Sequence, residues 1–322
     1  MIEKHTGEPE LDISMVLPVY NESGNLKWFI PELSEALRAM GRSYEIIAVN
    51  DGSTDDSLEV LRELKKDEPN LRIIRFRRNF GQTAGFAAGF DLARGRYVIT
   101  MDADGQNDPV DISRLLDVMI EGDYDIVSGW RKERKEPFFS RRLPSMIANR
   151  IIGKSTGVEL HDYGCSLKIY HRDVAKNVNL YGELHRFIPA LASGLGVRVA
   201  EVGVNDRPRK YGSSKYNISK TVRVVLDLAT VTFLLSYMAR PMQLFGLAGL
   251  LSSGLGFGLA LYLALFKLFT GADIGNRPLL SLAILLMILG VQFIVMGLLG
   301  EVQARTYFEV QNKPIYVIRA EE

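Results

Sequence analysis

Three aspartates, Asp102, Asp104 and Asp108, follow an apolar run in the stretch VITMDADGQNDP. In extended backbone, side chains two residues apart share a face, so we expect Asp102 and Asp104 to point into the same space. Two carboxylates this close repel each other unless a cation lies between them. Mg²⁺ accepts such oxygen ligands and often shares them with a substrate's phosphates. The pattern therefore predicts a site for a divalent cation and a phosphate.

For two acidic residues, Asp108 and Asp51, a purely structural role is the alternative to ligand binding. Asp108 stands before Pro109, which favours the first turn of a helix, so we interpret Asp108 as a helix N-cap. Asp51 lies in NDGSTDD, from Asn50 to Asp56. It can accept hydrogen bonds from the base or ribose of a nucleotide, or belong to a turn before a capped helix. Both interpretations of Asp51 can hold together.

Apolar runs and helical patterns alternate through the first half of the chain and position these acids. We predict strands at 13–19, 44–50, 71–76, 97–101 and 125–129, and helices at 24–40, 54–66, 82–93 and 109–121. This alternation is typical of an α/β fold with a largely parallel sheet and helices on both faces. Ligands bind such sheets at the carboxyl ends of strands, where PVYNES, NDGSTDD and DADGQ lie. A dinucleotide-binding Rossmann site is disfavoured, because G-x-G-x-x-G does not follow the first strand.

Charge is nearly balanced over the chain, at +1, but unevenly distributed. Residues 241–266 and 278–300 contain no charged side chain, and each is long enough for a bilayer, which takes about 20 apolar residues. Basic residues cluster before the first span and the N-terminus is polar, so we expect the large N-terminal part in the cytoplasm. The single Cys165 fits a reducing compartment. No nucleic-acid partner is expected.

The motifs PVYNE, NDGS and DADGQ, in this order and spacing, resemble family 2 glycosyltransferases of the GT-A fold. SGWR, DYGCSLKIY, RKYGSSKY and two spans ending in GLLGE make the chain similar to the polyprenyl-phosphate glycosyltransferases. That group includes dolichol-phosphate mannose synthases, bactoprenol glucosyltransferases and undecaprenyl-phosphate aminoarabinose transferases. The resemblance implies inverting, metal-dependent transfer of a single sugar from a nucleotide sugar, UDP by default, to a polyprenyl phosphate such as undecaprenyl phosphate, in cell-envelope glycosylation.

The resemblance also implies roles for matching positions. The nucleotide would be bound by Pro18, Tyr20, Glu22, Asp51 and Asp102. Mg²⁺ or Mn²⁺ would be held on the diphosphate by Asp104 and Gln106, and the catalytic set would be Asp102, Asp104 and Asp162. Many inverting relatives carry a base near the position of Asp162. A lipid phosphate is already ionised, however, so orientation of a substrate is an equal interpretation.

Basic and hydroxyl side chains are expected to bind the acceptor's phosphate: Arg131, Arg141, Ser145, Arg209, Ser214 and Lys215. Arginine offers paired donors to phosphate, and lysine a point charge. A solvated basic face near anionic lipid headgroups is the alternative for any one of the arginines. His185 and Arg186 open a helical segment. They either cap this segment or line the site.

We therefore expect a GT-A domain over 1–215, an amphipathic interface helix over 216–238, two transmembrane helices within 239–300 (about 241–268 and 278–300) and a cytoplasmic tail over 301–322. The protein would be a multi-pass protein of the inner or plasma membrane, with both termini cytoplasmic. Small residues four apart, Gly249 with Ser253 and Gly254 with Gly258, allow close helix packing within one chain or in a homo-oligomer.

Two other classes remain as alternatives. One is a non-catalytic nucleotide-sugar-binding membrane module, which loss of one of the paired acids would favour; both acids are present. The other is a relative of the processive polysaccharide synthases, which share the early motifs. Their usual Q-x-x-R-W signature is missing, because Trp28 and Trp130 stand in other contexts.

Overall fold

The computed structural model describes residues 10–132, 153, 156–178, 180, 184–210, 241–275 and 277–310. The chain divides into two compact units, one up to Val231 and one from Thr232. The predicted interface helix over 216–238 lies outside the described residues, as do four predicted acceptor contacts, Arg141, Ser145, Ser214 and Lys215.

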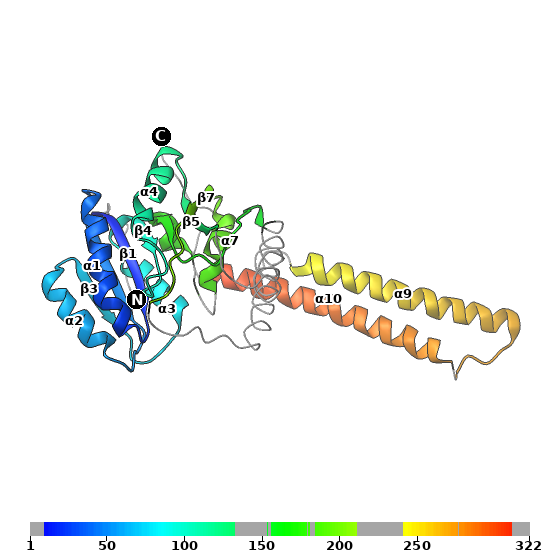
Figure 1. The fold of residues 1–322 in the computed structure, drawn as a ribbon. Coiled ribbons are helices and arrows are strands. Elements are labelled where there is room, and N and C mark those ends of the chain that lie inside the picture. Colours follow the sequence, from blue (N-terminus) through cyan, green and yellow to red (C-terminus); the bar gives the residue numbers. More distant parts are fainter. Residues whose placement is uncertain are drawn as a thin grey trace. The chain divides into compact units, whose positions relative to one another are not determined.

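A central sheet organises the N-terminal unit (Figure 1). Within the described residues it has seven strands, in the order β3-β2-β1-β4-β6-β5-β7. They are β1 (Leu11–Val19), β2 (Tyr44–Asn50), β3 (Leu71–Arg75), β4 (Gly95–Thr100), β5 (Ile126–Arg131), β6 (Lys168–His171) and β7 (Val199–Val204). Strand β6 runs antiparallel to β4 and β5, and the other neighbours pair in parallel. The predicted α/β fold with a largely parallel sheet is confirmed.

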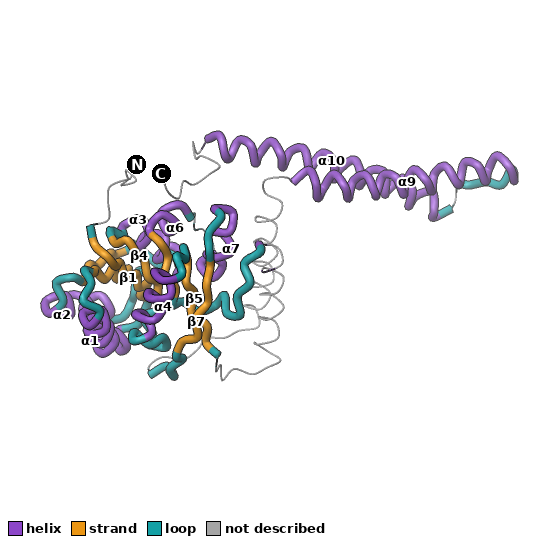
Figure 2. The backbone as a smooth tube through the Cα atoms, turned by 90° about the horizontal axis from the view of Figure 1, so that it is seen from above, coloured by secondary structure: helices purple, strands orange, loops and turns teal. Residues whose placement is uncertain are grey.

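Helices cover both faces of this sheet (Figure 2). One core contains side chains of α1 (Ser23–Ala39), α2 (Ser57–Asp67) and α4 (Asp111–Glu121). The other contains side chains of α3 (Gln82–Leu92), α6 (Arg172–Asn177) and α7 (Ile188–Ala192), which follows the short 3-10 helix η2 (Leu184–Phe187). Successive residues of the central strands enter opposite cores, because strand side chains alternate between faces. The strands therefore read as continuous apolar runs.

Helix α3 lies close against β1. A Cβ atom added at Gly85 would stand 2.9 Å from the Cβ atom of Pro18, and one added at Gly89 would overlap the side chain of Val16. Glycine at these two positions lets the helix approach the strand. The close approach brings the first residue of α3, Gln82, to the carboxyl end of β4, where its amide donates a hydrogen bond to Asp102.

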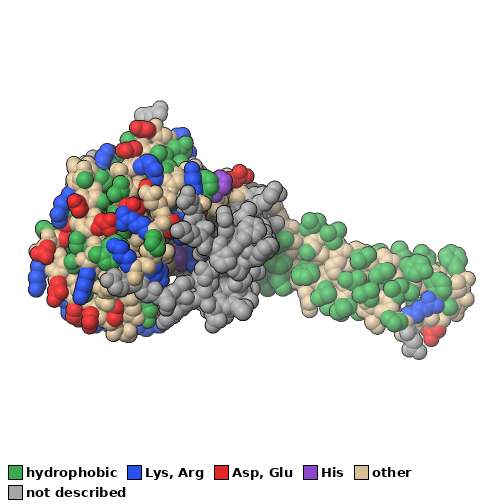
Figure 3. Space-filling model, viewed as in Figure 1, with side chains coloured by type: hydrophobic (Ala, Val, Ile, Leu, Met, Phe, Trp, Pro, Cys, Tyr) green, Lys and Arg blue, Asp and Glu red, His purple; other side chains and the backbone are tan. Residues whose placement is uncertain are grey.

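The C-terminal unit contains two long helices, α9 (Pro241–Thr270) and α10 (Pro278–Val310). Both are long and apolar enough to cross a membrane, and apolar side chains crowd their surface in Figure 3. They pack closely at Gly249, where an added Cβ atom would stand 2.6 Å from the carbonyl oxygen of Gly290, whereas Gly254 and Gly258 face open space. Helix α10 continues past residue 300, where the tail was expected to begin. The helix formers Glu301, Gln303 and Arg305 and the absence of a proline favour this continuation.

Candidate active site

Three acidic side chains meet where two neighbouring strands end. Glu22 follows β1, and Asp102 and Asp104 follow β4, which pairs with β1. Burial raises the pKa of Asp102 to about 6, and the charge of Asp104 adds to the rise. Burial and the charges of Asp104 and Asp102 also raise the pKa of Glu22, although Asn25 donates a 2.6 Å hydrogen bond to it. The three carboxylates are thus crowded enough to destabilise one another's charge.

This donor set suits a hard divalent cation that keeps other ligands. Among the described residues, no group of three or more His, Cys, Asp or Glu side chains is arranged so that it could hold a metal ion by itself. Crowded aspartate oxygens are nevertheless the partners that Mg²⁺ or Mn²⁺ accepts when water and substrate phosphates complete the shell. Gln106 contacts Asp104 through its backbone N–H, at 3.1 Å from Oδ1.

A basic segment, residues 207–210, contacts the acid loop, which we define as residues 102–108. The guanidinium of Arg209 pairs with Asp104. The guanidinium of Arg207 pairs with Asp108 at 2.6 Å and with Glu32 at 2.7 Å. Arg209, a predicted phosphate ligand, therefore neutralises the aspartate that is expected to hold the cation.

The prediction that Asp108 is a helix N-cap is wrong. Helix α4 begins at Asp111, with Val110 at the capping position and no side-chain cap. Asp108 instead accepts the backbone N–H of Val110 at 3.1 Å and pairs with Arg207. The reason is that Pro109 and Val110 form a turn before the helix, which places Asp108 two residues before the capping position.

The predicted nucleotide contacts gather at the ends of three adjacent strands, β2, β1 and β4. Asp51, which is 3% exposed, accepts the backbone N–H groups of Phe80 at 2.6 Å and Gly81 at 2.8 Å. It therefore ties the loop after β3 to the end of β2. Pro18 lies in β1 under α3, and Tyr20 is 47% exposed at the edge of the site.

Asp162 and Arg131 form a buried ion pair. Arg131 Nε lies 2.9 Å from Asp162 Oδ2, and Oδ1 accepts the backbone N–H of Gly164 at 3.0 Å. Hydrogen bonding to Asp162 raises the pKa of Arg131 against the opposing effect of burial. Glu201 of β7 accepts the backbone N–H of Asp162 at 2.9 Å, which holds this segment in place. Asp162 therefore fixes the position of the Arg131 side chain.

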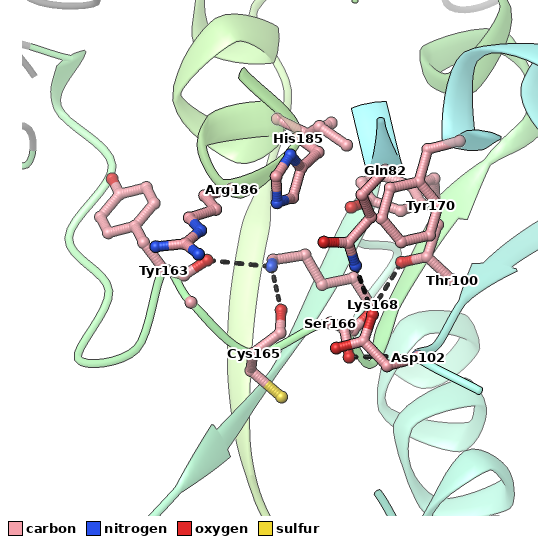
Figure 4. A pocket seen from close by; sticks show the side chains of 13 residues that line it. Gln82, Thr100, Asp102, Tyr163, Cys165, Ser166, Lys168, Tyr170, His185 and Arg186 are labelled. Carbon is pink, nitrogen blue, oxygen red and sulfur yellow. Dashed lines mark hydrogen bonds between the residues drawn. The ribbon is translucent and has the colours of Figure 1, made fainter. Parts of the chain in front are cut away.

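A cavity of about 70 Å³ opens beside Asp102 (Figure 4). Its polar lining comes from α3, β4, β6 and η2, and includes Gln82, Thr100, Asp102, Lys168, His185 and Arg186. Burial first, then the charges of Arg186 and Lys168, lower the pKa of His185 to about 3, so this ring is neutral at pH 7. Of the two interpretations of His185 and Arg186, the structure favours lining the site.

Lys168 and Gln82 are site residues that the sequence interpretation missed. Lys168 stands in DYGCSLKIY, where a lysine inside a short apolar run was the available signal. Only the antiparallel pairing of β6 with β4 turns it toward the carboxyl end of β4. Gln82 opens α3, and its side chain reaches Asp102.

Comparison with known proteins agrees with this geometry. The family model described as glycosyl transferase family 2 matches residues 14–178. A dodecaprenyl-phosphate galacturonate synthase of Rhizobium johnstonii is 44% identical over 319 residues, covering 98% of this chain and 94% of the relative. An undecaprenyl-phosphate 4-deoxy-4-formamido-L-arabinose transferase of Aeromonas hydrophila is 36% identical, over 95% of this chain and 92% of the relative.

A solved structure shares the fold. Glucosyl-3-phosphoglycerate synthase from Mycobacterium tuberculosis, in complex with Mn²⁺ and uridine-diphosphate-glucose, superposes with a TM-score of 0.53 at 17% identity. The match covers 69% of this chain and 79% of that one. At this identity the likeness concerns the fold alone.

Proposed function

The chain belongs to glycosyl transferase family 2, and from this premise we propose that it transfers one sugar from a nucleotide sugar to a polyprenyl phosphate. Relatives named for polyprenyl-phosphate substrates match nearly the whole chain, which supports the acceptor class. Two helices that are long and apolar enough for a bilayer would hold the enzyme where such a lipid lies. The carbon-to-oxygen bond to the leaving diphosphate would break as the lipid phosphate oxygen attacks the anomeric carbon from the opposite side, with inversion.

The observation that carries the proposal is the crowding of Glu22, Asp102 and Asp104. Burial first, and then the charges of neighbouring acids, raise the pKa of Glu22 and Asp102, so these carboxylates need an external cation or proton to be stable beside Asp104. Asp102 and Asp104 are the residues that would hold Mg²⁺ or Mn²⁺. When bound, the cation offsets the negative charge that develops on the leaving diphosphate.

The chain's own residues position the two substrates. Asp51 fixes the loop after β3 through Phe80 and Gly81, beside the expected place of the nucleoside, for which uridine is our proposal. Asp162 holds Arg131 and Gly164. Because a phosphate monoester is mostly ionised near neutral pH, it needs no general base. We assign Asp162 to positioning, with Arg131 and Arg209 facing the phosphates.

Placement in the membrane follows from the same proposal. Basic residues precede the first span and the connector between spans carries few charges, so the catalytic domain and both termini would lie in the cytoplasm. Lys215 and its neighbours would meet the lipid at headgroup depth. The enzyme would therefore load its lipid carrier at the cytoplasmic face of the inner or plasma membrane.

Release of nucleoside diphosphate tests the proposal. Purified full-length protein in detergent with Mn²⁺ would be given a panel of sugar nucleotides, with and without a short polyprenyl phosphate. We expect release only with the lipid. In the variant Asp104→Ala, we expect turnover to fall by about 100-fold or more, since electrostatic stabilisation of the leaving group is lost.

Asp117→Ala is the matched control, because Asp117 is an exposed aspartate of α4. It should release nucleoside diphosphate at the native rate. Nucleotide binding without lipid-dependent release from any donor would contradict the proposal and favour a binding module. Many sugars added to one lipid would instead indicate a processive enzyme.

A further inference from the structure

The cations around the candidate site fall into two groups. In the first group, each arginine pairs with carboxylates of the chain. Arg131 pairs with Asp162, and Arg209 pairs with Asp104. Arg207 pairs with both Asp108 and Glu32. Lys168 and Arg186, which line the cavity beside Asp102, form no ion pair within 4.0 Å among the described residues. The first group is neutralised by the protein itself. The second group has no such neutralising partner among the residues that the structure describes.

Burial makes the charge of Lys168 costly. Its residue is 2% exposed, and burial lowers its pKa. The ammonium donates to the backbone carbonyl oxygens of Tyr163, at 3.1 Å, and Cys165. These bonds use two of its three N–H donors and supply no negative charge. A buried cation without a paired anion is unfavourable, so this position suits an anion that arrives with a ligand.

The other described side chains of the cavity do not supply enough negative charge to balance Lys168 and Arg186. The thiol of Cys165 stays protonated, because burial raises its pKa to about 11. His185 is neutral at pH 7 and bonds through Nδ1 to Thr83 Oγ1 at 2.8 Å. Asp102 is the one carboxylate among the described residues of the lining. With Lys168 and Arg186 charged, the described residues of the lining keep one excess positive charge even when Asp102 is ionised.

We propose that Lys168 and Arg186 form an oxyanion subsite for a carboxylate on the donor's sugar, so that the enzyme transfers a uronic acid rather than a neutral hexose. The inference rests on the proposed function. One carboxylate matches the excess charge of the lining. Its planar oxygens match the paired donors of an arginine. The volume of about 70 Å³ has room for a group about the size of two waters, which a carboxylate fits.

The position of the cavity favours the donor over the acceptor. Asp102 forms one wall and also belongs to the acid loop that would hold the donor's diphosphate. Gln82, in the adjoining wall, donates to Asp102. A group in this cavity would thus be continuous with the donor's sugar. A doubly charged phosphate monoester facing Asp102 would exceed the available positive charge.

Arg186 is the residue to change, because its side chain is exposed, whereas loss of Lys168 would strand two backbone carbonyls. Full-length protein with Mn²⁺ and undecaprenyl phosphate would be assayed with UDP-galacturonate, UDP-glucuronate, UDP-galactose and UDP-glucose. We expect native kcat/KM to favour a uronate over its neutral hexose. Arg186→Gln should lower kcat/KM for that uronate by about 10- to 100-fold, the effect of a lost charged hydrogen bond. It should affect the hexose far less.

Two further variants sharpen the result. Arg186→Lys keeps the charge but not the paired donors, so it should recover part of the uronate activity. Arg62→Gln makes the same substitution at an exposed arginine of α2 and should leave the donor preference as in the native protein. A native preference for neutral donors would overturn the inference. So would an Arg186→Gln effect on the KM of undecaprenyl phosphate that is equal for all donors, since the subsite would then serve the acceptor.

A binding measurement separates failure of the subsite from failure of the proposed function. Saturating D-galacturonate or D-glucuronate should raise the thermal unfolding temperature of the native protein more than D-galactose or D-glucose does. Arg186→Gln should abolish that difference. This result would support the subsite even if no UDP donor were turned over, which would count against the proposed function alone. Equal stabilisation by acidic and neutral sugars would overturn the subsite even in an active transferase.

Discussion

The two halves of the candidate site treat charge in opposite ways. In the half that includes the acid loop, carboxylates outnumber the nearby cations among the described residues, and Arg209 and Arg207 of the basic segment pair with Asp104 and Asp108. In the half around the cavity, Lys168 and Arg186 have no carboxylate partner among the residues that the structure describes. One half is built for a cation and the other for an anion.

This difference separates side chains that hold the protein together from those that await a ligand. Asp51 and Asp162 look like ligand-binding acids in the sequence, yet both are occupied by donors of the chain. Glu22 and Asp102 keep raised pKa values despite their hydrogen bonds. A buried charge that the fold does not balance is the better indicator of a substrate.

The largest expected effect comes from Asp102→Asn, which removes a charge from the acidic half. We expect turnover to fall by about 100- to 1000-fold, because a group that faces the developing charge is lost. At neutral pH the variant should nevertheless be more stable than the native protein. One pKa unit corresponds to about 1.4 kcal/mol, so the ionised, partly buried carboxylate destabilises the fold by up to about 3 kcal/mol.

The size of that stability difference depends on pH. The folded pKa of Asp102, about 6, lies above its ordinary value of 3.8, so the folded chain binds this proton more tightly than the unfolded chain. Its favourable contribution is complete below pH 3.8 and is lost as the pH rises through about 6. Heat unfolding in detergent across this range should show the advantage of Asp102→Asn growing with pH. Parallel pH profiles for the two proteins would contradict it.

A smaller effect is expected from breaking the Arg131–Asp162 pair, whose side chains are 21% and 3% exposed. Arg131→Gln or Asp162→Asn alone should cost about 3 kcal/mol, because Arg131→Gln leaves the buried charge of Asp162 unpaired and Asp162→Asn leaves the partly buried charge of Arg131 unpaired. The double variant should lose clearly less than the two single losses combined. Denaturant unfolding of all four proteins measures this coupling, and strictly additive losses would show that the pair is not a unit.

The smallest effect concerns Arg209, which covers Asp104. In the variant Arg209→Gln, Mn²⁺ should bind about two- to fivefold more tightly when no nucleotide is present, because a partly exposed ion pair is worth up to about 1 kcal/mol. Paramagnetic resonance of free Mn²⁺ reports this affinity. Arg198→Gln, at an exposed arginine that pairs with Asp123, is the matched control and should bind as the native protein does. Weaker binding in Arg209→Gln would show that Arg209 does not compete with the cation.

Much of the fold could be predicted because its information is local. Strands β1 to β5 and helices α1 to α4 appear close to their predicted bounds, since buried parallel strands and amphipathic helices leave different apolar periods. Strands β6 and β7 escaped prediction. Strand β6 has four residues, one a buried lysine, and β7 contains a glycine and a glutamate, so neither run has a clear period.

The same limit applied to the site. The spacing of Asp102 and Asp104 after an apolar run was sufficient to indicate crowded acids, because neighbours in the chain share a strand end. The pairing of Arg131 with Asp162, or of Arg209 with Asp104, joins residues far apart in the sequence. No local pattern could reveal it. The N-cap interpretation of Asp108 failed for a local reason, because the turn at Pro109 and Val110 delays the start of the helix to Asp111. The ion pair of Asp108 with Arg207 joins distant segments and could not be predicted locally either.

By itself, the sequence determined the α/β class, the two apolar spans and the acids at the strand ends, because each depends on residues adjacent in the chain. Tertiary structure alone decided which charges are balanced. It paired Arg131, Arg207 and Arg209 with acids, and it placed Lys168 and Arg186 around a common cavity with no ion pair to an acid of the described residues. Electrostatic balance depends on distances through space, and only the folded chain sets those distances.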